Sequence, residues 1–229
     1  MNDFMLGNEA IARGAYEAGV RLVSSYPGTP STEITEYCAK YPEIYAEWAA
    51  NEKVALEVCA GASMAGARSI CCMKHVGLNV ASDPLYTLAY TGVNGGLVVV
   101  VADDPGMHSS QNEQDSRMHA RGSQVPMLEP SDSDECRAFT KLAFELSEKY
   151  DTPVFVRTTT RVAHARSVVH PQERVEAALK PYQKDISKWV MMPGMAKGRH
   201  VVVEKRMTHL AMDAHALRGN RLQLGHPKI

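Results

Sequence analysis

The chain has 229 residues, of which 45% are hydrophobic and 22% are charged, and this composition is typical of a soluble globular protein with one large core. No run approaches the roughly 18 apolar residues of a membrane span, and the first residues lack the basic and apolar regions of a signal peptide. We therefore expect a cytoplasmic protein that does not associate with a membrane.

Charge is distributed unevenly along the chain. The formal net charge is −9 for residues 1–160 and +8 for residues 161–229, counting Lys and Arg against Asp and Glu. Nucleic-acid binding is one interpretation of the basic tail, but its basic residues are scattered among apolar ones and aromatic residues are few. We favour a tail that packs against its own acidic domain or against a partner subunit, and we expect no nucleic-acid partner.

Residues 1–160 alternate short apolar runs with helical patterns, which predicts an α/β fold with a parallel sheet and helices on both faces. The predicted strands are 21–26, 44–48, 69–74, 97–103, 125–128 and 153–158. The predicted helices are 8–18, 31–40, 51–67, 83–91, 112–121 and 132–149. Only a strand that is covered on both sides needs two apolar faces, so the run at 97–103 should be the central strand.

Residues 161–229 predict an arm or linker rather than a second core. A short apolar run at 200–203 and a helix near 205–217 stand among Pro and Gly residues that interrupt regular structure.

The five cysteines predict buried thiols rather than a site. Their number is odd and the chain has no CxxC pair. A disulfide framework, a zinc site or an iron–sulfur site would need paired spacings, so we expect no metal ligands among them. The residues are Cys38, Cys59, Cys71, Cys72 and Cys136.

The first candidate site is the turn YPGTPS at residues 26–31. Two prolines and Gly28 fix its backbone and present Thr29 and Ser31 at the start of the following helix. A rigid turn with Ser31 as a helix cap is one interpretation. The other is that the helix N-terminus holds an anion such as a substrate carboxylate.

The second candidate is Glu52, at the start of a helix that continues into the small-residue segment 60–67. An acid in a first turn usually just complements the helix dipole. The alternative is a carboxyl in a dry interface that can share a proton with a ligand nitrogen. Gly61 and Gly66 would each cost about 1 kcal/mol inside a helix, so we expect a close helix or ligand approach there, and a subunit interface in an oligomer.

The third candidate combines two segments that follow predicted strands. We expect residues 74–79 to form a loop, and the polar stretch 103–117 suits a ligand-facing loop. A metal pair at Asp103 and Asp104 has weak support, because no further ligand falls at a suitable spacing.

Five motifs together closely resemble the N-terminal part of the alpha subunit of indolepyruvate:ferredoxin oxidoreductases. They are GNEAIARG at residues 7–14, YPGTPS at 26–31, NEKVALE at 51–57, KHVGLNV at 74–80, and ADDP with HSSQNEQDSR at 102–117. Each motif alone would be weak, but all of them fall in the family's order. The resemblance runs from about residue 6 to the end of the chain.

The resemblance implies a thiamine diphosphate enzyme that oxidatively decarboxylates arylpyruvates, with Mg²⁺, [4Fe-4S] clusters, a beta subunit, ferredoxin and coenzyme A. Residues 1–160 would be its pyrimidine-binding domain, and 161–229 would lead to further domains. Glu52 would be the catalytic acid that hydrogen-bonds the pyrimidine ring nitrogen N1′ and shares a proton with it. The remaining implied contacts are Gly28, His75, Gly77 and Asn79 with the cofactor, and Thr29, Ser31 and Arg117 with the substrate.

The chain also departs from the family's pattern. It has no Gly-Asp-Gly segment with a distal Asn to hold Mg²⁺ and the diphosphate, and no cysteine-rich pattern for clusters. We therefore expect half of an active site, which is inactive without diphosphate-binding and iron–sulfur domains or subunits. Two alternatives are the pyrimidine subunit of a split, non-oxidative 2-oxoacid decarboxylase and a non-catalytic assembly module.

Overall fold

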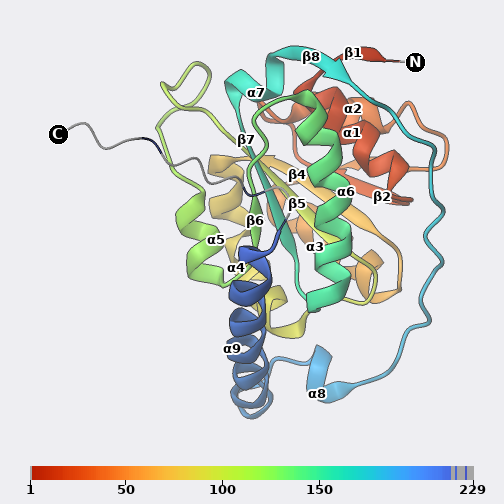
Figure 1. The fold of residues 1–229 in the computed structure, drawn as a ribbon. Helices are drawn as coiled ribbons and strands as arrows, with labels where there is room; N and C mark the ends of the chain where they lie inside the picture. Colours follow the sequence, from red (N-terminus) through yellow and green to blue (C-terminus); the bar gives the residue numbers. More distant parts are fainter. Residues whose placement is uncertain (1, 218–219, 221–224, 226–229) are drawn as a thin grey trace.

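The computed structural model describes residues 2–217, 220 and 225. At its centre is a six-stranded parallel sheet of order β3-β2-β4-β5-β7-β6 (Figure 1). The strands are β2 (Leu22–Ser25), β3 (Tyr45–Trp48), β4 (Ser69–Lys74), β5 (Leu97–Asp103), β6 (Met127–Leu128) and β7 (Val154–Thr159). The predicted parallel sheet is confirmed, and β5 lies inside it between β4 and β7.

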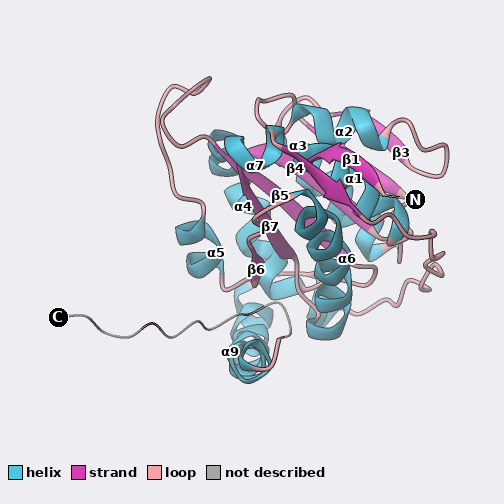
Figure 2. Ribbon diagram, turned by 45° about the horizontal axis from the view of Figure 1, so that its top comes forward, coloured by secondary structure: helices cyan, strands magenta, loops and turns pink. Residues whose placement is uncertain are grey.

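Helices cover both faces of the sheet (Figure 2). One layer consists of α1 (Gly7–Glu17), α2 (Thr32–Cys38) and α6 (Ser133–Tyr150), and the other of α3 (Glu52–Met64), α4 (His75–Thr91) and α5 (Arg117–Ser123). Along β5, Val98 and Val100 pack into the first core, whereas Val99 and Val101 pack into the second. This alternation explains why the run is apolar on both faces.

The predicted start of α4 was wrong. Pro84 favours a helix that begins near residue 83, because proline is tolerated in a first turn. In the structure the helix begins at His75 and continues through Pro84. Leu78, Ala81 and Leu85 are fully buried at helical spacing, so packing against the sheet extends the helix over the segment expected to be a loop.

Two further helix bounds differ from the predictions. Helix α5 begins at Arg117 and not at residue 112, because the backbone N–H of Ser116 is held by the Asp103 carboxylate at 3.1 Å. Helix α3 ends at Met64, and Gly66 lies beyond it with a φ of +93°. Gly66 therefore ends the helix in a left-handed conformation and is not the interior glycine that was expected.

An antiparallel pair of short strands was missed. β1 (Asp3–Leu6) pairs with β8 (Arg166–Val169). Each strand has only four residues, and its partner lies more than 150 residues away in the chain, so no local pattern indicates the pairing.

The arm after residue 160 folds back onto its own domain. It contains α7 (Thr160–His164), α8 (Ile186–Trp189) and α9 (Pro193–His215), and the chain between β8 and α8 runs along the side of the domain (Figure 1). The helix predicted near 205–217 is thus longer and includes the run 200–203. Lys188 and Arg199 pair with Asp151 at 2.8 and 3.2 Å, so the basic arm neutralises acidic groups of the domain.

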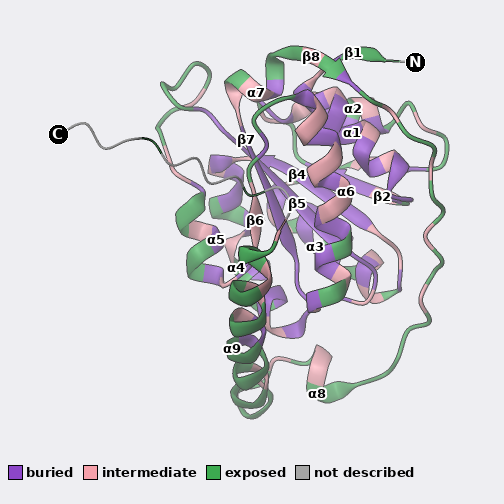
Figure 3. Cartoon of the chain, in the orientation of Figure 1, coloured by how far each residue is buried: buried purple, intermediate pink, exposed green. Residues whose placement is uncertain are grey.

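Burial is concentrated in the sheet and the inner helix faces, while α9 is mostly exposed (Figure 3). All five cysteines are buried and free, which confirms the predicted thiols. None of the helices in the described ranges is long and apolar enough to cross a membrane.

Candidate functional site

The candidate residues follow parallel strands, so the fold brings them to the carboxyl edge of the sheet. The turn at 26–31 follows β2, Glu52 follows β3, His75 follows β4, and the polar loop at 104–116 follows β5. This is the edge at which open α/β sheets bind ligands.

Glu52 is the first residue of α3. The side chain of Asn51 caps this helix by accepting a hydrogen bond from the backbone N–H of Val54 at 3.0 Å. Glu52 is 9% exposed. Within the described part of the chain its carboxyl has no hydrogen-bond partner, so a buried acid remains available to a ligand.

Gly77 lies directly against that carboxyl. A Cβ atom at Gly77 would stand 2.4 Å from Glu52 Oε1 and 2.6 Å from its Cγ. Gly77 belongs to the first turn of α4 and not to a loop, which corrects the prediction for residues 74–79. The carboxyl therefore packs on the bare N-terminal turn of the neighbouring helix.

His75 and Asn79, which also belong to α4 rather than to a loop, occupy different environments. His75 is fully buried, and its Nε2 lies 3.0 Å from the carbonyl oxygen of Asn112. Its Nδ1 has no partner among the described residues. Asn79 is exposed on the helix surface. His75 thus fastens the polar loop to α4, whereas Asn79 points away from the packed interior.

The turn after β2 is held by its own hydrogen bonds. The Gly28 N–H donates to Thr32 Oγ1 at 2.9 Å, and the Ser31 hydroxyl donates to the Gly28 carbonyl at 2.8 Å. Ser31 stands at the N-cap position, but its side chain does not cap the helix. Ser31 is buried and its hydroxyl is occupied, so of the two hydroxyl residues Thr29 and Ser31 only Thr29 presents an exposed side chain for a ligand.

Asp104 organises the polar loop. Its carboxylate accepts hydrogen bonds from Ser109 N, Ser110 Oγ and Thr160 Oγ1 at 2.7 to 2.8 Å. Burial raises the pKa of Asp104, but these hydrogen bonds outweigh burial and hold that pKa well below its usual value. Asp104 therefore anchors the loop.

Asp103 is occupied in the same way. Its carboxylate pairs with Arg157 Nε at 2.8 Å and accepts from Ser116 N. Across the described ranges, no group of three or more His, Cys, Asp or Glu side chains could hold a metal ion.

Arg117 is the first residue of α5. Its guanidinium pairs with Asp115, with Nε 2.9 Å from Oδ1 and Nη2 2.9 Å from Oδ2. The side chain is 52% exposed. The structure thus leaves Arg117 accessible but paired within the chain.

Two residues that sequence reasoning missed join these segments. Lys74 packs on Gly28, where a Cβ would stand 3.0 Å from Lys74 Cδ, and its Nζ donates to the Ser109 carbonyl at 3.2 Å. The Ser109 hydroxyl in turn lies 3.5 Å from the Thr29 carbonyl. The turn with Thr29, the start of α4 and the polar loop therefore form one connected surface. In the sequence, only the place of Lys74 at the end of a predicted strand and of Ser109 in the loop after another indicated this connection.

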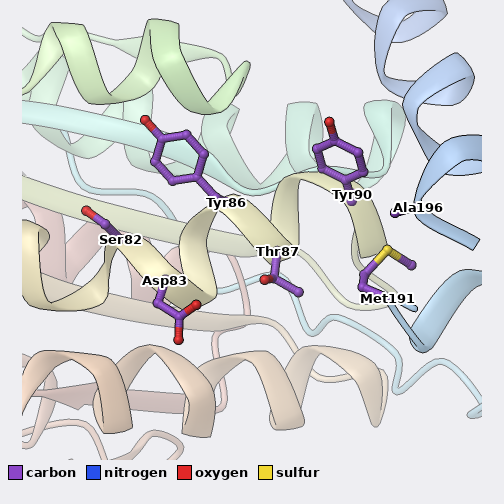
Figure 4. A pocket seen from close by; sticks show the side chains of 7 residues that line it. All are labelled: Ser82, Asp83, Tyr86, Thr87, Tyr90, Met191 and Ala196. Atoms are coloured by element: carbon purple, nitrogen blue, oxygen red, sulfur yellow. The ribbon is translucent and has the colours of Figure 1, made fainter. Parts of the chain in front are cut away.

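A separate groove of about 490 Å³ lies on the outer face of α4 (Figure 4). Tyr86, Thr87 and Tyr90 line it from α4, and Met191 and Ala196 line it from the arm. A second groove of about 330 Å³ continues from it between α3 and α4, sharing two lining residues with the first. Glu52 is not among the residues that line these two grooves.

The family model for the thiamine diphosphate-binding part of pyruvate flavodoxin/ferredoxin oxidoreductases matches residues 13–223. Indolepyruvate oxidoreductase subunit IorA of Methanothermobacter thermautotrophicus is 50% identical over 223 residues, which cover 96% of this chain and 36% of that protein. The same subunit of Pyrococcus horikoshii is 49% identical over 86% of this chain and 32% of its own length. The chain thus spans about a third of the length of these relatives. Their identity to it confirms the resemblance that its motifs indicated.

More distant relatives share the fold. 2-Oxoglutarate synthase subunit KorA of Methanocaldococcus jannaschii is 31% identical over 81% of this chain and 54% of its own length. A solved 2-oxoglutarate:ferredoxin oxidoreductase of Magnetococcus marinus, with 2-oxoglutarate, coenzyme A and succinyl-CoA bound, superposes with a TM-score of 0.76. It is 21% identical and covers 93% of this chain and 45% of that one. The chain belongs to the pyruvate flavodoxin/ferredoxin oxidoreductase family, as its thiamine diphosphate-binding part.

Proposed function

We propose that this chain is the pyrimidine-binding part of a thiamine diphosphate-dependent indolepyruvate:ferredoxin oxidoreductase. The observation that carries the proposal is the Glu52 carboxyl, which is buried at the carboxyl edge of the sheet without a partner among the described residues. Identity near 50% to indolepyruvate oxidoreductase subunits supports arylpyruvate as the substrate class.

The residues fit a pyrimidine ring. A flat heteroaromatic ring needs one carboxyl for its ring nitrogen and a surface without bulky side chains, and Glu52 with Gly77 supplies both. Glu52 would hydrogen-bond the ring nitrogen, while Gly28, His75 and Asn79 remain predicted cofactor neighbours. Of these, His75 would act through the loop that it fastens, since its ring is fully buried.

Glu52 would do the acid–base work of this chain. A carboxyl can both donate a proton to a ring nitrogen and take it back, which an amide cannot do. Bound thiamine diphosphate would supply the group that stabilises the carbanion formed by decarboxylation. Thr29 would contact the substrate next to the cofactor. Arg117 would release Asp115 and bind the substrate carboxylate. For Ser31, a direct substrate contact would require its buried hydroxyl to leave Gly28.

The rest of the reaction would depend on other domains or subunits. The matched indolepyruvate oxidoreductase relatives are named as subunits, and this chain spans about a third of their length. We propose that those parts hold Mg²⁺, the diphosphate and [4Fe-4S] clusters, and that they meet the beta subunit, ferredoxin and coenzyme A. A cytoplasmic location stays a prediction.

We further propose an oligomeric assembly through the outer face of α3 and α4. Val54, Val80 and Tyr86 expose 37%, 47% and 44% of their surface there. Gly61 of α3 has no atom within 4 Å of its Cβ position, so a neighbouring helix could approach it closely. The groove lined by Tyr86, Thr87 and Tyr90 makes the surface of α4 concave (Figure 4), and the second groove lies between α3 and α4.

Substituting Glu52→Gln in the complete enzyme tests the proposed function. The amide keeps a hydrogen bond but cannot share the proton, so turnover of indolepyruvate should fall about 100-fold or more, measured as ferredoxin reduction. Glu145→Gln, on an exposed position of α6, is the control and should keep full activity. Unchanged turnover in Glu52→Gln would remove the catalytic role and favour a non-catalytic module.

A further inference from the structure

Gly77 is a glycine whose backbone does not require glycine. Its φ lies outside the left-handed range, and it stands in the first turn of a regular helix. Glycine destabilises such a helix relative to alanine, because it loses more backbone freedom on folding. Its presence therefore needs another physical reason.

The three atoms nearest to the missing side chain all belong to Glu52. A Cβ at Gly77 would lie 2.4 Å from Oε1, 2.6 Å from Cγ and 2.7 Å from Cδ. Rotation of the carboxyl group alone could move Oε1 but not Cγ. The whole Glu52 side chain would have to leave its position, and at 9% exposure it has little free space to enter.

We propose that Gly77 is a positioning residue, whose missing side chain leaves the space into which α3 places the Glu52 carboxyl. The first turn of α4 thus leaves room for the Glu52 carboxyl and packs against it. A substitution of Gly77 affects the reaction by displacing Glu52. The link to catalysis rests on the function proposed above, but the packing relation does not. The two can therefore be tested separately.

A double-mutant cycle in urea unfolding tests the packing relation on the 229-residue chain. Gly77→Ala should lower the urea midpoint when Glu52 is present. With Glu52→Ala, the three crowding atoms are gone, so the same Gly77→Ala change should leave the midpoint unchanged or raise it. Gly198→Ala in α9 is the control, since its Cβ would meet nothing within 4 Å.

Each result of this cycle either supports or overturns the positioning role of Gly77. If Gly77→Ala lowers the midpoint equally in both backgrounds, the positioning role is overturned. If Gly77→Ala alone does not fold but the double variant does, the role is supported. Failure of both variants to fold overturns it, because the crowding would then not come from Glu52.

Cofactor affinity in the complete complex tests the link to the proposed function. Gly77→Ala should weaken thiamine diphosphate binding about tenfold or more, the loss of one charge-assisted hydrogen bond, and Gly198→Ala should not. If the two substitutions are coupled in the urea midpoint but Gly77→Ala leaves cofactor affinity unchanged, the proposed role of Glu52 is overturned and the packing relation is kept. If the urea midpoint shows no coupling between the two substitutions, the positioning role is overturned whatever the cofactor affinity.

Discussion

At the scale of single residues, Arg117 and Asp115 form an exposed ion pair. In this pair a ligand carboxylate can take the place of Asp115. The hydrogen bond and the charge of Arg117 hold the pKa of the Asp115 carboxyl below its usual value. Exposed pairs contribute little to folding, so their separation costs little. A 2-oxo acid presents a carboxylate of the same shape and charge, and it could replace Asp115 on the guanidinium.

Arg117→Ala in the complete enzyme should therefore raise the KM for the 2-oxo acid about tenfold or more, since a hydrogen bond to a charged group is lost. The value of kcat should change little, because the carboxylate contact is the same before and during reaction. Arg121→Ala, an exposed arginine on the same helix, is the control. A KM that stays at the parent value would assign carboxylate recognition to another residue.

Helix α4 is fixed at both ends by other elements. Its first turn carries Gly77 against α3. The last carbonyl groups of a helix have no donor within the helix, and here two arginines of α9 act as donors. Arg206 donates to Ala89 O at 2.6 Å, and Arg199 donates to Tyr90 O at 2.6 Å. The two cations also complement the negative end of the helix. Burial lowers the pKa of Arg206 to about 10. The hydrogen bonds from Arg206 and Arg199 let the arm stabilise α4, the helix that carries Gly77.

Arg206→Met should destabilise the chain by about 1–3 kcal/mol, because it leaves the buried Ala89 carbonyl without its donor. Equilibrium unfolding in urea measures this difference. Lys205→Met, at the exposed neighbouring position, should change stability little. Equal effects of the two substitutions would show that the arm does not stabilise α4 through this contact.

At the scale of the whole molecule, ion pairs hold carboxylates of the domain, some to cations of the domain itself and others to cations of the basic arm. Glu17 is fully buried and pairs with Arg13, Arg137 and Lys141 at 3.0 to 3.1 Å. Glu148 pairs with Arg68 of the domain at 2.9 Å and with Lys180 of the arm at 3.2 Å. These carboxylates keep their pairing only while they are ionised.

Stability should therefore fall in acid. Burial raises the pKa of Glu148, but the hydrogen bond and charge of Arg68 outweigh burial and lower it to about 2, below the ordinary value of 4.5. Its contribution is complete above pH 4.5 and is lost as the pH falls toward 2. Urea unfolding at a series of pH values should show a smaller acid dependence for Glu148→Gln than for the parent chain. The exposed control Glu145→Gln should follow the parent, and identical curves for all three would contradict the assignment.

Local patterns predicted most of the fold because the sheet is parallel and its strands are buried on both faces. The run at 97–103 and the strand at 69–74 were predicted with their observed bounds. Segments whose structure depends on distant partners were not predicted. Residues 75–82 become helical because Leu78 and Ala81 pack on the sheet, although their polar and glycine-containing sequence and Pro84 favour a later start.

The sequence by itself determined the α/β class, the succession of strands and helices along residues 1–160, the family motifs and the acid at the start of α3, because each of these depends on neighbouring residues. Only the tertiary structure decided that Gly77 makes room for Glu52, that Ser31 is occupied by its own turn, and that arginines of α9 complete α4. These relations join segments that are distant in the chain or depend on the direction of a single hydroxyl. Burial and hydrogen bonding, which exist only in the folded chain, fix them.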